Sequence, residues 1–399
     1  MKMHNRSLAV VRGSLARFTR RWLIFGFMFG LATLSCPGAE STKAKGGNTK
    51  GGRPLDPAIT QRNDAYAKQL EGHLLKWLID DYPERSRQAW HRDYSGLDSF
   101  ERSVAPNRKH WRQLLNPPQL NKTGALTRRP HPALADLNAE WIVLPLGDLT
   151  AEGVLVFPAG ASPQSPVPLV IAQHGIGSTP ESPFSSPDAG YRAYARELLK
   201  AGFAVLAPFN LRSVPSRNRI ERLTRLANTT LPGIEFSRLQ HLLDVVLTDP
   251  RIDRDRVGMW GVSLGGMATM FFMPLEPRIK AGVVSAWFNH RLSKMAVSSK
   301  QYSTFLDTPE EHAFFNGWLT EFADYDAITL ICPRPVLIQH GKQDSISHWP
   351  DLVKEYDASK AHYDKLGIGD RIGLDLHEGL HEARPDTGIP FLKRWLKVP

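Results

Sequence analysis

The chain has 399 residues, of which 42% are hydrophobic, and a formal net charge of +10. This length suits one large α/β domain with additions or two smaller domains, and the hydrophobic content is ordinary for a globular protein. Residues 1–53 carry ten Lys or Arg and one Glu, and so account for nine of the ten net charges. The remainder is nearly neutral, which excludes nucleic acid as an expected partner.

The basic N-terminal segment has the layout of an export signal. Arg20 and Arg21 precede the apolar run 22–34, and small residues follow around 35–39. The run is short for a membrane span, and an uncleaved N-terminal anchor is the alternative. The arginine pair also resembles a twin-arginine signal. We therefore expect residues 1–39 to be an export signal. The mature protein is then periplasmic or extracellular, with no membrane partner after signal removal.

A linker and a set of helices are expected between the signal and the main domain. Residues 40–56 are rich in Gly, Lys, Ser and Thr, a composition typical of a disordered linker. Helical periodicity begins near Asp56, and a second helix is predicted from about 97 to 115. These predict a helical N-terminal extension over 57–135 that packs on the main domain; a role at the border of a substrate site is the alternative. The recurring apolar face comprises Ile59, Tyr66, Leu70, Leu74, Leu75 and Leu78.

From Trp141 onward, short apolar runs alternate with helical stretches. Several runs are continuously apolar, as strands covered on both faces are. The alternation predicts an α/β fold at 136–399, with a mostly parallel central sheet and helices on both faces. The first two strands, 141–146 and 153–157, are predicted to form a hairpin. The other strands are predicted at 168–173, 203–207, 257–262, 281–286, 335–339 and 371–376, and the helices at 191–200, 234–247, 264–272, 351–366 and 389–396.

The clearest functional signal is a G-x-S-x-G pattern centred on Ser263, between an apolar strand and a helix-compatible segment. In that context the serine lies on a tight turn, and glycine is needed at 261 and 265 because larger side chains would collide. The amide N–H of Leu264 and the positive end of the following helix point to where a substrate oxyanion would develop. A glycine-rich turn without catalytic meaning is the alternative.

Three segments carry further features of one family. They are Gln173 to Gly177 after a strand, Asp253 to Gly258 leading into the serine turn, and His340 to Asp344 after the strand at 335–339. Together with the turn, they resemble the α/β-hydrolase superfamily, especially its dienelactone-hydrolase-like and acetylxylan-esterase-like branches. These branches share features with prolyl-oligopeptidase catalytic domains. The resemblance covers about residues 140–399 and implies the α/β-hydrolase fold, whereas the helical extension has no equivalent in the minimal fold.

The resemblance also implies a catalytic triad. Ser263 matches the nucleophile, Asp344 the acid after its strand, and His381 the base in the loop after the final strand. This order, Ser then Asp then His, is the one expected of the fold. A serine hydroxyl needs a base to accept its proton, and the acid fixes the imidazole tautomer. The competing acids are Asp324, Asp326 and Asp351, and the competing base is His377.

A second oxyanion donor is expected in the loop that follows the strand at 168–173. By the same resemblance, this donor is the backbone N–H of Ile176, because glycine at 175 and 177 lets the main chain approach the substrate. His174 is expected to support that loop by hydrogen bonds. Trp287, directly after the strand at 281–286, is a further candidate for substrate binding.

Residues 377–381 also match H-E-x-x-H, the zinc-protease motif. That motif works on a helix, where residues i and i+4 share a face. Here it follows a strand-like run and contains Gly379, and only 18 residues remain to supply a third ligand. We therefore expect neither a metal nor another cofactor.

The predicted function is that of an exported serine hydrolase, which cleaves carboxylic esters through an acyl-enzyme. By resemblance only, acetylated or uronate-esterified polysaccharide is a reasonable substrate class, and small-molecule esters are equally compatible. The alternatives are a serine peptidase of the prolyl-oligopeptidase-like type and a non-catalytic binding protein with a hydrolase fold. The sequence does not predict the oligomeric state.

About 25 residues separate the strand at 203–207 from the helix at 234–247, and connections this long are usually lids or binding loops. Within them, Ile220, Leu223 and Leu226 repeat on one face of a short helix. Arg219, Arg222 and Arg225 repeat with the same spacing on a neighbouring face. They are either a solvated basic face or a lid whose guanidinium groups receive substrate carboxylates.

Overall fold

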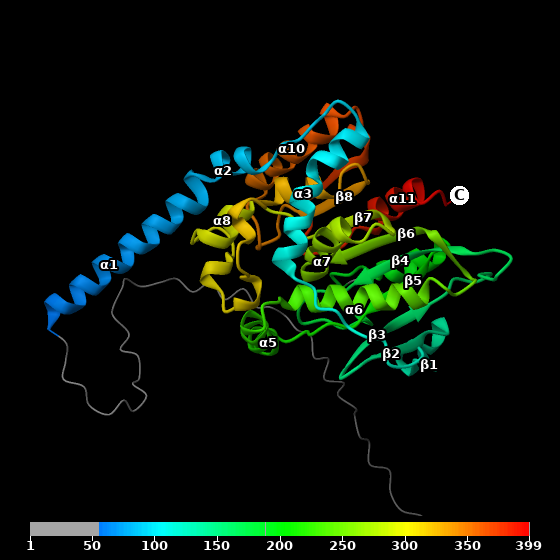
Figure 1. The fold of residues 1–399 in the computed structure, drawn as a ribbon. Helices are drawn as coiled ribbons and strands as arrows, with labels where there is room; N and C mark the ends of the chain where they lie inside the picture. Colours follow the sequence, from blue (N-terminus) through cyan, green and yellow to red (C-terminus); the bar gives the residue numbers. More distant parts are fainter. Residues whose placement is uncertain (1–55, 188, 399) are drawn as a thin grey trace, which may run out of the picture. The chain divides into compact units, whose positions relative to one another are not determined.

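The computed structural model describes residues 56–187 and 189–398 (Figure 1). The predicted export signal at 1–39, and all but the last residue of the linker at 40–56, lie outside these ranges. None of the helices in the described ranges combines the length and the hydropathy that a membrane span requires.

The centre of the described structure is a sheet with the strand order β1-β2-β3-β5-β4-β6-β7-β8-β9. The first three strands pair antiparallel, and β3 also runs antiparallel to β5, whereas the strands from β5 to β9 in this order are parallel. The bounds are β1 Thr127–Pro130, β2 Glu140–Leu146, β3 Leu149–Val156, β4 Val167–Gln173, β5 Ala204–Pro208, β6 Ile252–Val262, β7 Ile279–Ser285, β8 Val336–Gly341 and β9 Ile372–His377.

Every strand predicted from the sequence is present within a few residues, and the predicted hairpin is the β2–β3 pair. The short strand β1 was not predicted, because all four of its side chains are exposed and give no apolar signal. In contrast, β5 and β8 are buried along their whole length, as expected of parallel strands covered on both faces.

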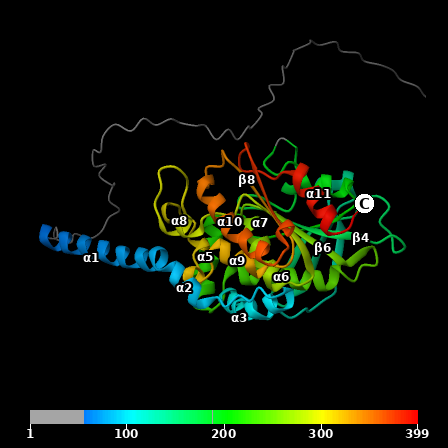
Figure 2. The ribbon, with the colours of Figure 1, turned by 90° about the horizontal axis from the view of Figure 1, so that it is seen from above.

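Helices cover both faces of the sheet, and Figure 2 shows α3 and α6 on the side opposite to α11. Buried apolar residues of α3, α6, α7 and α10 join the core on one face, and those of α4 and α11 join the core on the other. This arrangement confirms the α/β fold predicted from the alternating pattern. The helices of these two layers are α3 Leu97–Leu115, α4 Tyr194–Lys200, α6 Leu231–Val246, α7 Leu264–Phe272, α10 Trp349–Lys365 and α11 Pro385–Trp395.

The helices before the sheet differ from each other in burial. Helix α3 buries Phe100, Val104, Trp111 and Leu115 in the main core. Helix α1, Pro57–Leu75, has no buried residue, and most of its predicted apolar face is exposed, whereas Leu78, just beyond its end, packs against the main core. A period of 3.6 residues indicates a helix and its apolar side, but not whether another surface covers it. A π-helical turn, Lys76–Asp80, and α2, Tyr82–Ala89, lie between α1 and α3.

Two long connections follow the carboxyl ends of parallel strands. The one after β5 contains α5, Val214–Leu226, which confirms the predicted short helix. The one after β7 runs from about 286 to 335, and its elements were not predicted from the sequence. It contains α8 Arg291–Ala296, α9 Asp324–Ala327 and the 3-10 turns Phe305–Asp307, Glu311–Ala313, Trp318–Thr320 and Ile328–Leu330; the other 3-10 turns of the described chain are Pro132–Leu137, Ser182–Phe184, Met273–Leu275 and Gly369–Arg371.

Candidate active site

The turn between β6 and α7 holds Ser263 in a strained backbone conformation, with φ 60° and ψ −122°. Its amide N–H donates to the carbonyl of Ser285 on the neighbouring strand, at 2.9 Å. A Cβ atom at position 261 would lie 2.0 Å from the carbonyl oxygen of Gly265, and one at position 265 would lie 2.1 Å from that of Gln173. Glycine is therefore sterically required on both sides of the serine. Backbone strain of this kind costs of order 1–3 kcal/mol and clusters at functional sites.

The loop after β4 lies directly against this turn. A Cβ atom at Gly175 would lie 3.1 Å from Cβ of Ser263. The loop is held by His174, whose Nδ1 donates to the carbonyl of Gly175 at 2.9 Å and whose Nε2 accepts from the amide of Asn210 at 3.2 Å. Burial lowers the pKa of His174, so the ring is neutral and suited to this supporting position.

The two amides expected to receive an oxyanion lie on the two sides of this contact. Leu264 is the first residue of α7, and Ile176 follows Gly175; both line the pocket that contains Ser263. Neither amide donates to another residue of the described chain, although the neighbouring amides of Gly175 and Gly177 do. Both N–H groups thus remain available to a ligand.

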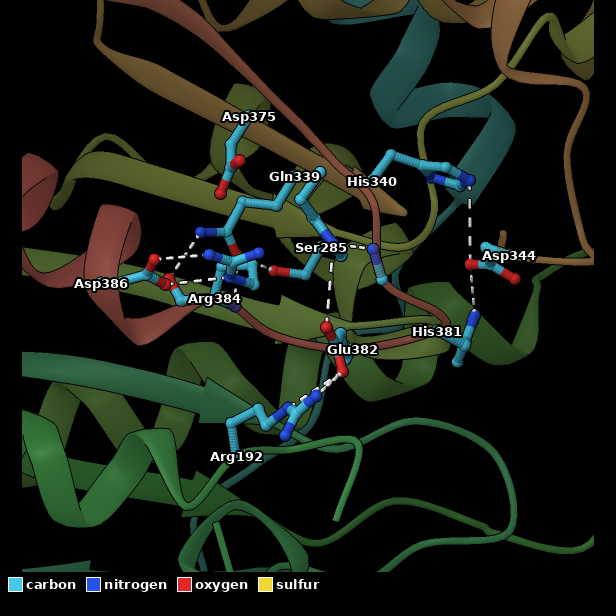
Figure 3. Close-up of polar contacts among 12 residues, drawn as sticks. Arg192, Ser285, Gln339, His340, Asp344, Asp375, His381, Glu382, Arg384 and Asp386 are labelled. Atoms are coloured by element: carbon cyan, nitrogen blue, oxygen red, sulfur yellow. Dashed lines mark hydrogen bonds and ion pairs between the residues drawn. The ribbon is translucent and has the colours of Figure 1, made fainter. Parts of the chain in front are cut away.

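Asp344 and His381 meet on the loops that follow β8 and β9, as Figure 3 shows. Nδ1 of His381 donates to Oδ2 of Asp344 at 2.8 Å. The carboxylate is 1% exposed and the imidazole 37%, so the acid is buried behind an accessible base. Burial raises the pKa of Asp344, but the hydrogen bond and charge of His381 outweigh it, and the pKa is lowered overall.

The competing acids have other partners. Asp324 forms a bidentate ion pair with Arg291, and Asp326 accepts hydrogen bonds from Tyr82 and Ser86. Asp351 pairs with His348 at 2.8 Å. Among the described residues, Asp344 is therefore the carboxylate that accepts the hydrogen bond of His381.

The competing base has other partners. His377 ends β9, and its Nδ1 accepts from the amide of Gly379 at 3.1 Å. Because His377 lies on a strand and His381 in a loop, the H-E-x-x-H residues do not share a helical face. In the described ranges, no cluster of three or more His, Cys, Asp or Glu side chains has the geometry of a metal site.

A buried glutamine, not predicted from the sequence, ties the His381 loop to the sheet (Figure 3). Gln339 of β8 accepts from Ser285 Oγ at 2.7 Å and from the amide of Arg384 at 3.1 Å, and its Nε2 donates to the carbonyl of Arg384 at 2.8 Å. Glu382 pairs with Arg192 on the other side of the loop. The continuously apolar start of β8 would have suggested that the polar residue following it has a specific partner, but not which one.

The pocket at Ser263 is open to solvent, and the empty space at it, part of the solvent included, is about 570 Å³. One side consists of the serine turn, Ile176 and Met267, and the other side comes from the connection after β7. Trp287, a predicted substrate-binding candidate, belongs to that second side. The remaining lining residues were not predicted, although the length of the connection was a usable signal. They include Arg291, Lys294, Ser303, Phe305, Glu310 and His312.

The arginines of α5 are placed differently from Trp287. Arg222 donates to Glu311 at 2.8 Å, and Arg225 donates to the carbonyl of Glu311 at 2.9 Å, so their acceptors belong to the segment that borders the pocket. Arg219 is exposed on the same helix. None of the three is among the described residues that line the pocket with Ser263.

Comparisons with solved structures identify the fold. An acetyl xylan esterase, provisionally assigned, from Bacteroides fragilis NCTC 9343 superposes with a TM-score of 0.62 and 16% identity, over 82% of this chain and 89% of that one. The chain has the α/β-hydrolase fold. A CE15 glucuronoyl esterase from Caldicellulosiruptor kristjansonii shares this fold with a TM-score of 0.53 and 18% identity, over 76% and 87% of the two chains.

Sequence comparisons give the class of enzyme. The sequence model of the prolyl oligopeptidase family matches residues 197–365, a range that includes Ser263. The provisionally assigned esterase YitV of Bacillus subtilis (strain 168) is 26% identical over 219 residues, which are 49% of this chain and 76% of the relative. This α/β-hydrolase is therefore a serine hydrolase, and the alternative of a non-catalytic binding protein falls away.

Proposed function

We propose that the protein hydrolyses carboxylic esters through an acyl-enzyme on Ser263, with His381 as general base and Asp344 as its orienting acid. The observation that carries the proposal is the buried carboxylate of Asp344 at 2.8 Å from Nδ1 of the accessible His381. It is supported by the strained backbone of Ser263. The esterase relative and the esterases of the same fold support ester over amide substrates.

The proposed reaction follows from what each group can do. His381 keeps its proton on Nδ1, toward Asp344, so its Nε2 is free to accept the proton of the Ser263 hydroxyl as Oγ attacks the ester carbonyl. The amides of Leu264 and Ile176 donate to the oxyanion. His381 then protonates the leaving alcohol, and a water molecule activated by the same imidazole releases the acid. No step requires a metal or an organic cofactor.

The test is the reaction of the enzyme with a fluorophosphonate probe, together with hydrolysis of 4-nitrophenyl acetate. Wild type should be labelled at Ser263, and Ser263→Ala should lose labelling and several orders of magnitude of kcat. Ser347→Ala is a matched control, since its hydroxyl contacts His340 and lies outside the proposed triad. A Ser263→Ala enzyme that retained a tenth of the wild-type kcat would refute the assignment.

A serine peptidase is the second candidate, favoured by the prolyl oligopeptidase match over 197–365. A panel of acetyl, feruloyl and uronoyl esters beside short proline-containing peptides separates the two. We expect esters to be cleaved and peptides to be left intact. Efficient cleavage of the peptides would assign the peptidase function instead.

We further propose that the enzyme acts outside the cytoplasm, on acetyl or uronate esters of polysaccharides. The arginine-bearing, apolar segment at 1–39 supports export, and the acetyl xylan and glucuronoyl esterases of the same fold support this substrate class. N-terminal sequencing of the protein recovered from the periplasm or medium tests the first part. A product that keeps residues 1–39 at the membrane would instead indicate an anchor.

A further inference from the structure

The pocket beside Ser263 contains a buried ammonium group without a carboxylate partner. Lys294 of α8 is only 4% exposed, yet it lines this pocket. Its Nζ donates to two backbone carbonyls, that of Ile346 at 2.7 Å and that of Ser303. An ammonium group has three N–H donors, so one donor remains after these bonds. No carboxylate among the described residues pairs with it.

A second cation lies one helical turn away on the same wall. Arg291 is 1% exposed and donates to Asp324 through Nε at 2.9 Å and Nη2 at 2.8 Å. Its Nη1 donates to no residue of the described chain, and its guanidinium lies 4.3 Å over the ring of Trp287. The indole N–H of Trp287 is also buried without an acceptor in the described ranges.

Each of these three side chains keeps one N–H donor that no residue of the described chain accepts. Two cations and one carboxylate, that of Glu310, line the pocket among the described residues. Glu310 accepts from Thr308 at 3.2 Å and forms no ion pair with Lys294. The Lys294 ammonium is held by two carbonyls and lies 5.0 Å from the centre of the Phe305 ring, but it has no counter-charge, and a neutral acetyl group would not supply one. An anionic ligand would, through charge-assisted hydrogen bonds.

We propose that Lys294, with Arg291 beside it, binds a free carboxylate carried by the ester substrate, so that the enzyme prefers esters that bear such a group. The inference rests on the proposed function, since it concerns the pocket of the same serine. The expected carboxylate-binding site then lies on the wall of the pocket and not on α5, where Arg222 and Arg225 already contact Glu311.

The protonation of Lys294 gives the proposal a signature in the unaltered enzyme. Burial, and then the charge of Arg291, lower the pKa of Lys294 to about 8, while Glu310 and Asp344 oppose this shift. The ammonium should therefore be lost as pH rises above about 8, and affinity for the carboxylate with it. Of the other groups around the pocket, Arg291 stays paired with Asp324, and burial lowers the pKa of His312 to about 3. Neither changes charge between pH 7 and 9.

The experiment compares esters that differ only in a carboxylate. On the acyl side, 4-nitrophenyl hydrogen adipate is compared with 4-nitrophenyl hexanoate; on the alcohol side, 4-acetoxybenzoate is compared with 4-acetoxybenzamide. We expect wild type to prefer the anionic member of one pair, which also tells on which side the carboxylate binds. In Lys294→Met, KM for that ester should rise about 100-fold, and the neutral ester should change less than threefold. Lys354→Met is the matched control, because that lysine is 75% exposed.

The preference of wild type, taken as the ratio of kcat/KM for the two esters, should fall as pH rises from 7 to 9. His381 acts on both esters alike, so its protonation cancels in this ratio. No preference in either pair, or a preference that neither pH nor Lys294→Met changes, would overturn the proposal. An equal loss of kcat/KM on both esters in Lys294→Met would also overturn it. Lys294 would then have only a structural role, holding Ser303 and Ile346 together.

A binding measurement separates this inference from the proposed function. In Ser263→Ala, adipate should raise Tm more than adipamide does, and adding Lys294→Met should abolish the difference. If adipate is bound but no ester is hydrolysed by wild type, the esterase assignment fails and the anion site stands. If esters are hydrolysed and adipate has no more effect than adipamide, the anion site fails and the esterase assignment stands.

Discussion

The Gln339 side chain gives the most direct way to disturb His381 without touching it. Gln339→Leu keeps the volume and removes the four hydrogen bonds that the amide makes to Ser285, Arg384 and Thr387. The carbonyl of Arg384 and the hydroxyl of Thr387 keep other partners. The amide N–H of Arg384 and the hydroxyl hydrogen of Ser285 keep no acceptor among the described residues. At about 1–3 kcal/mol for each of these two buried groups left unsatisfied, the free energy of unfolding should fall by roughly 2–6 kcal/mol.

The substitution should also lower the activity. Arg384 lies three residues after His381, so a shift of Arg384 would displace the imidazole. A displacement near 1 Å in a catalytic group costs about 100-fold in rate, so kcat should fall by about that factor with KM little changed. Urea unfolding gives the stability, and 4-nitrophenyl acetate hydrolysis under folded conditions gives the rate. Gln240→Leu is the control, since Gln240 makes one 3.3 Å contact to Glu276. A Gln339→Leu enzyme that is destabilised but keeps its kcat would refute this account of the loop.

Three further predictions concern the proposed triad acid, the effect of a chelator on activity, and stability at low pH. Asp344→Asn should lower kcat by up to about 10⁴-fold through the tautomer of His381, while Asp326→Asn should act on stability; a larger kcat loss in Asp326→Asn would mean that the acid is wrong. EDTA should leave hydrolysis unchanged, and a loss restored by zinc would revive the metal interpretation. The hydrogen bond from Arg251 lowers the pKa of Asp249 to about 2. Its stabilisation, about 1 kcal/mol after solvent screening, is present above the unfolded pKa near ~3.9 and is lost as pH falls toward 2. Asp249→Asn should therefore cost stability in urea at pH 7 but not at pH 2, and an equal cost at both would contradict the assignment.

The sheet was predictable because its signal is local. Strands such as β5 and β8 are buried on both faces, so their apolar runs are visible without knowledge of their neighbours. The turn at Ser263 was predictable for the same reason, since glycine at 261 and 265 is required by contacts within the turn and with the adjacent strand. The sequence therefore predicted the part of the site whose geometry is set by the main chain.

The wall of the pocket was not predictable, because it depends on contacts between segments far apart. Helix α5, which contacts Glu311 beside that wall, shows the same effect: its periodicity marked Leu223 and Leu226, yet these are 54% and 87% exposed. The buried face holds Arg217, Glu221 and Thr224 instead. Arg217 can be buried because Glu235 of α6 pairs with it at 2.6 Å. A polar side chain whose partner is remote in the sequence looks like a surface residue until the fold is known.

Trapping the proposed acyl-enzyme on Ser263 tests whether this serine is the nucleophile. The enzyme is mixed with 4-nitrophenyl acetate, quenched in acid within milliseconds to seconds, and examined by mass spectrometry after proteolysis. We expect a mass increase of one acetyl group on the peptide that carries Ser263, and no such increase in Ser263→Ala. Acetyl found on another residue, or a wild-type enzyme that turns over the ester while Ser263 stays unmodified and insensitive to a fluorophosphonate, would contradict it.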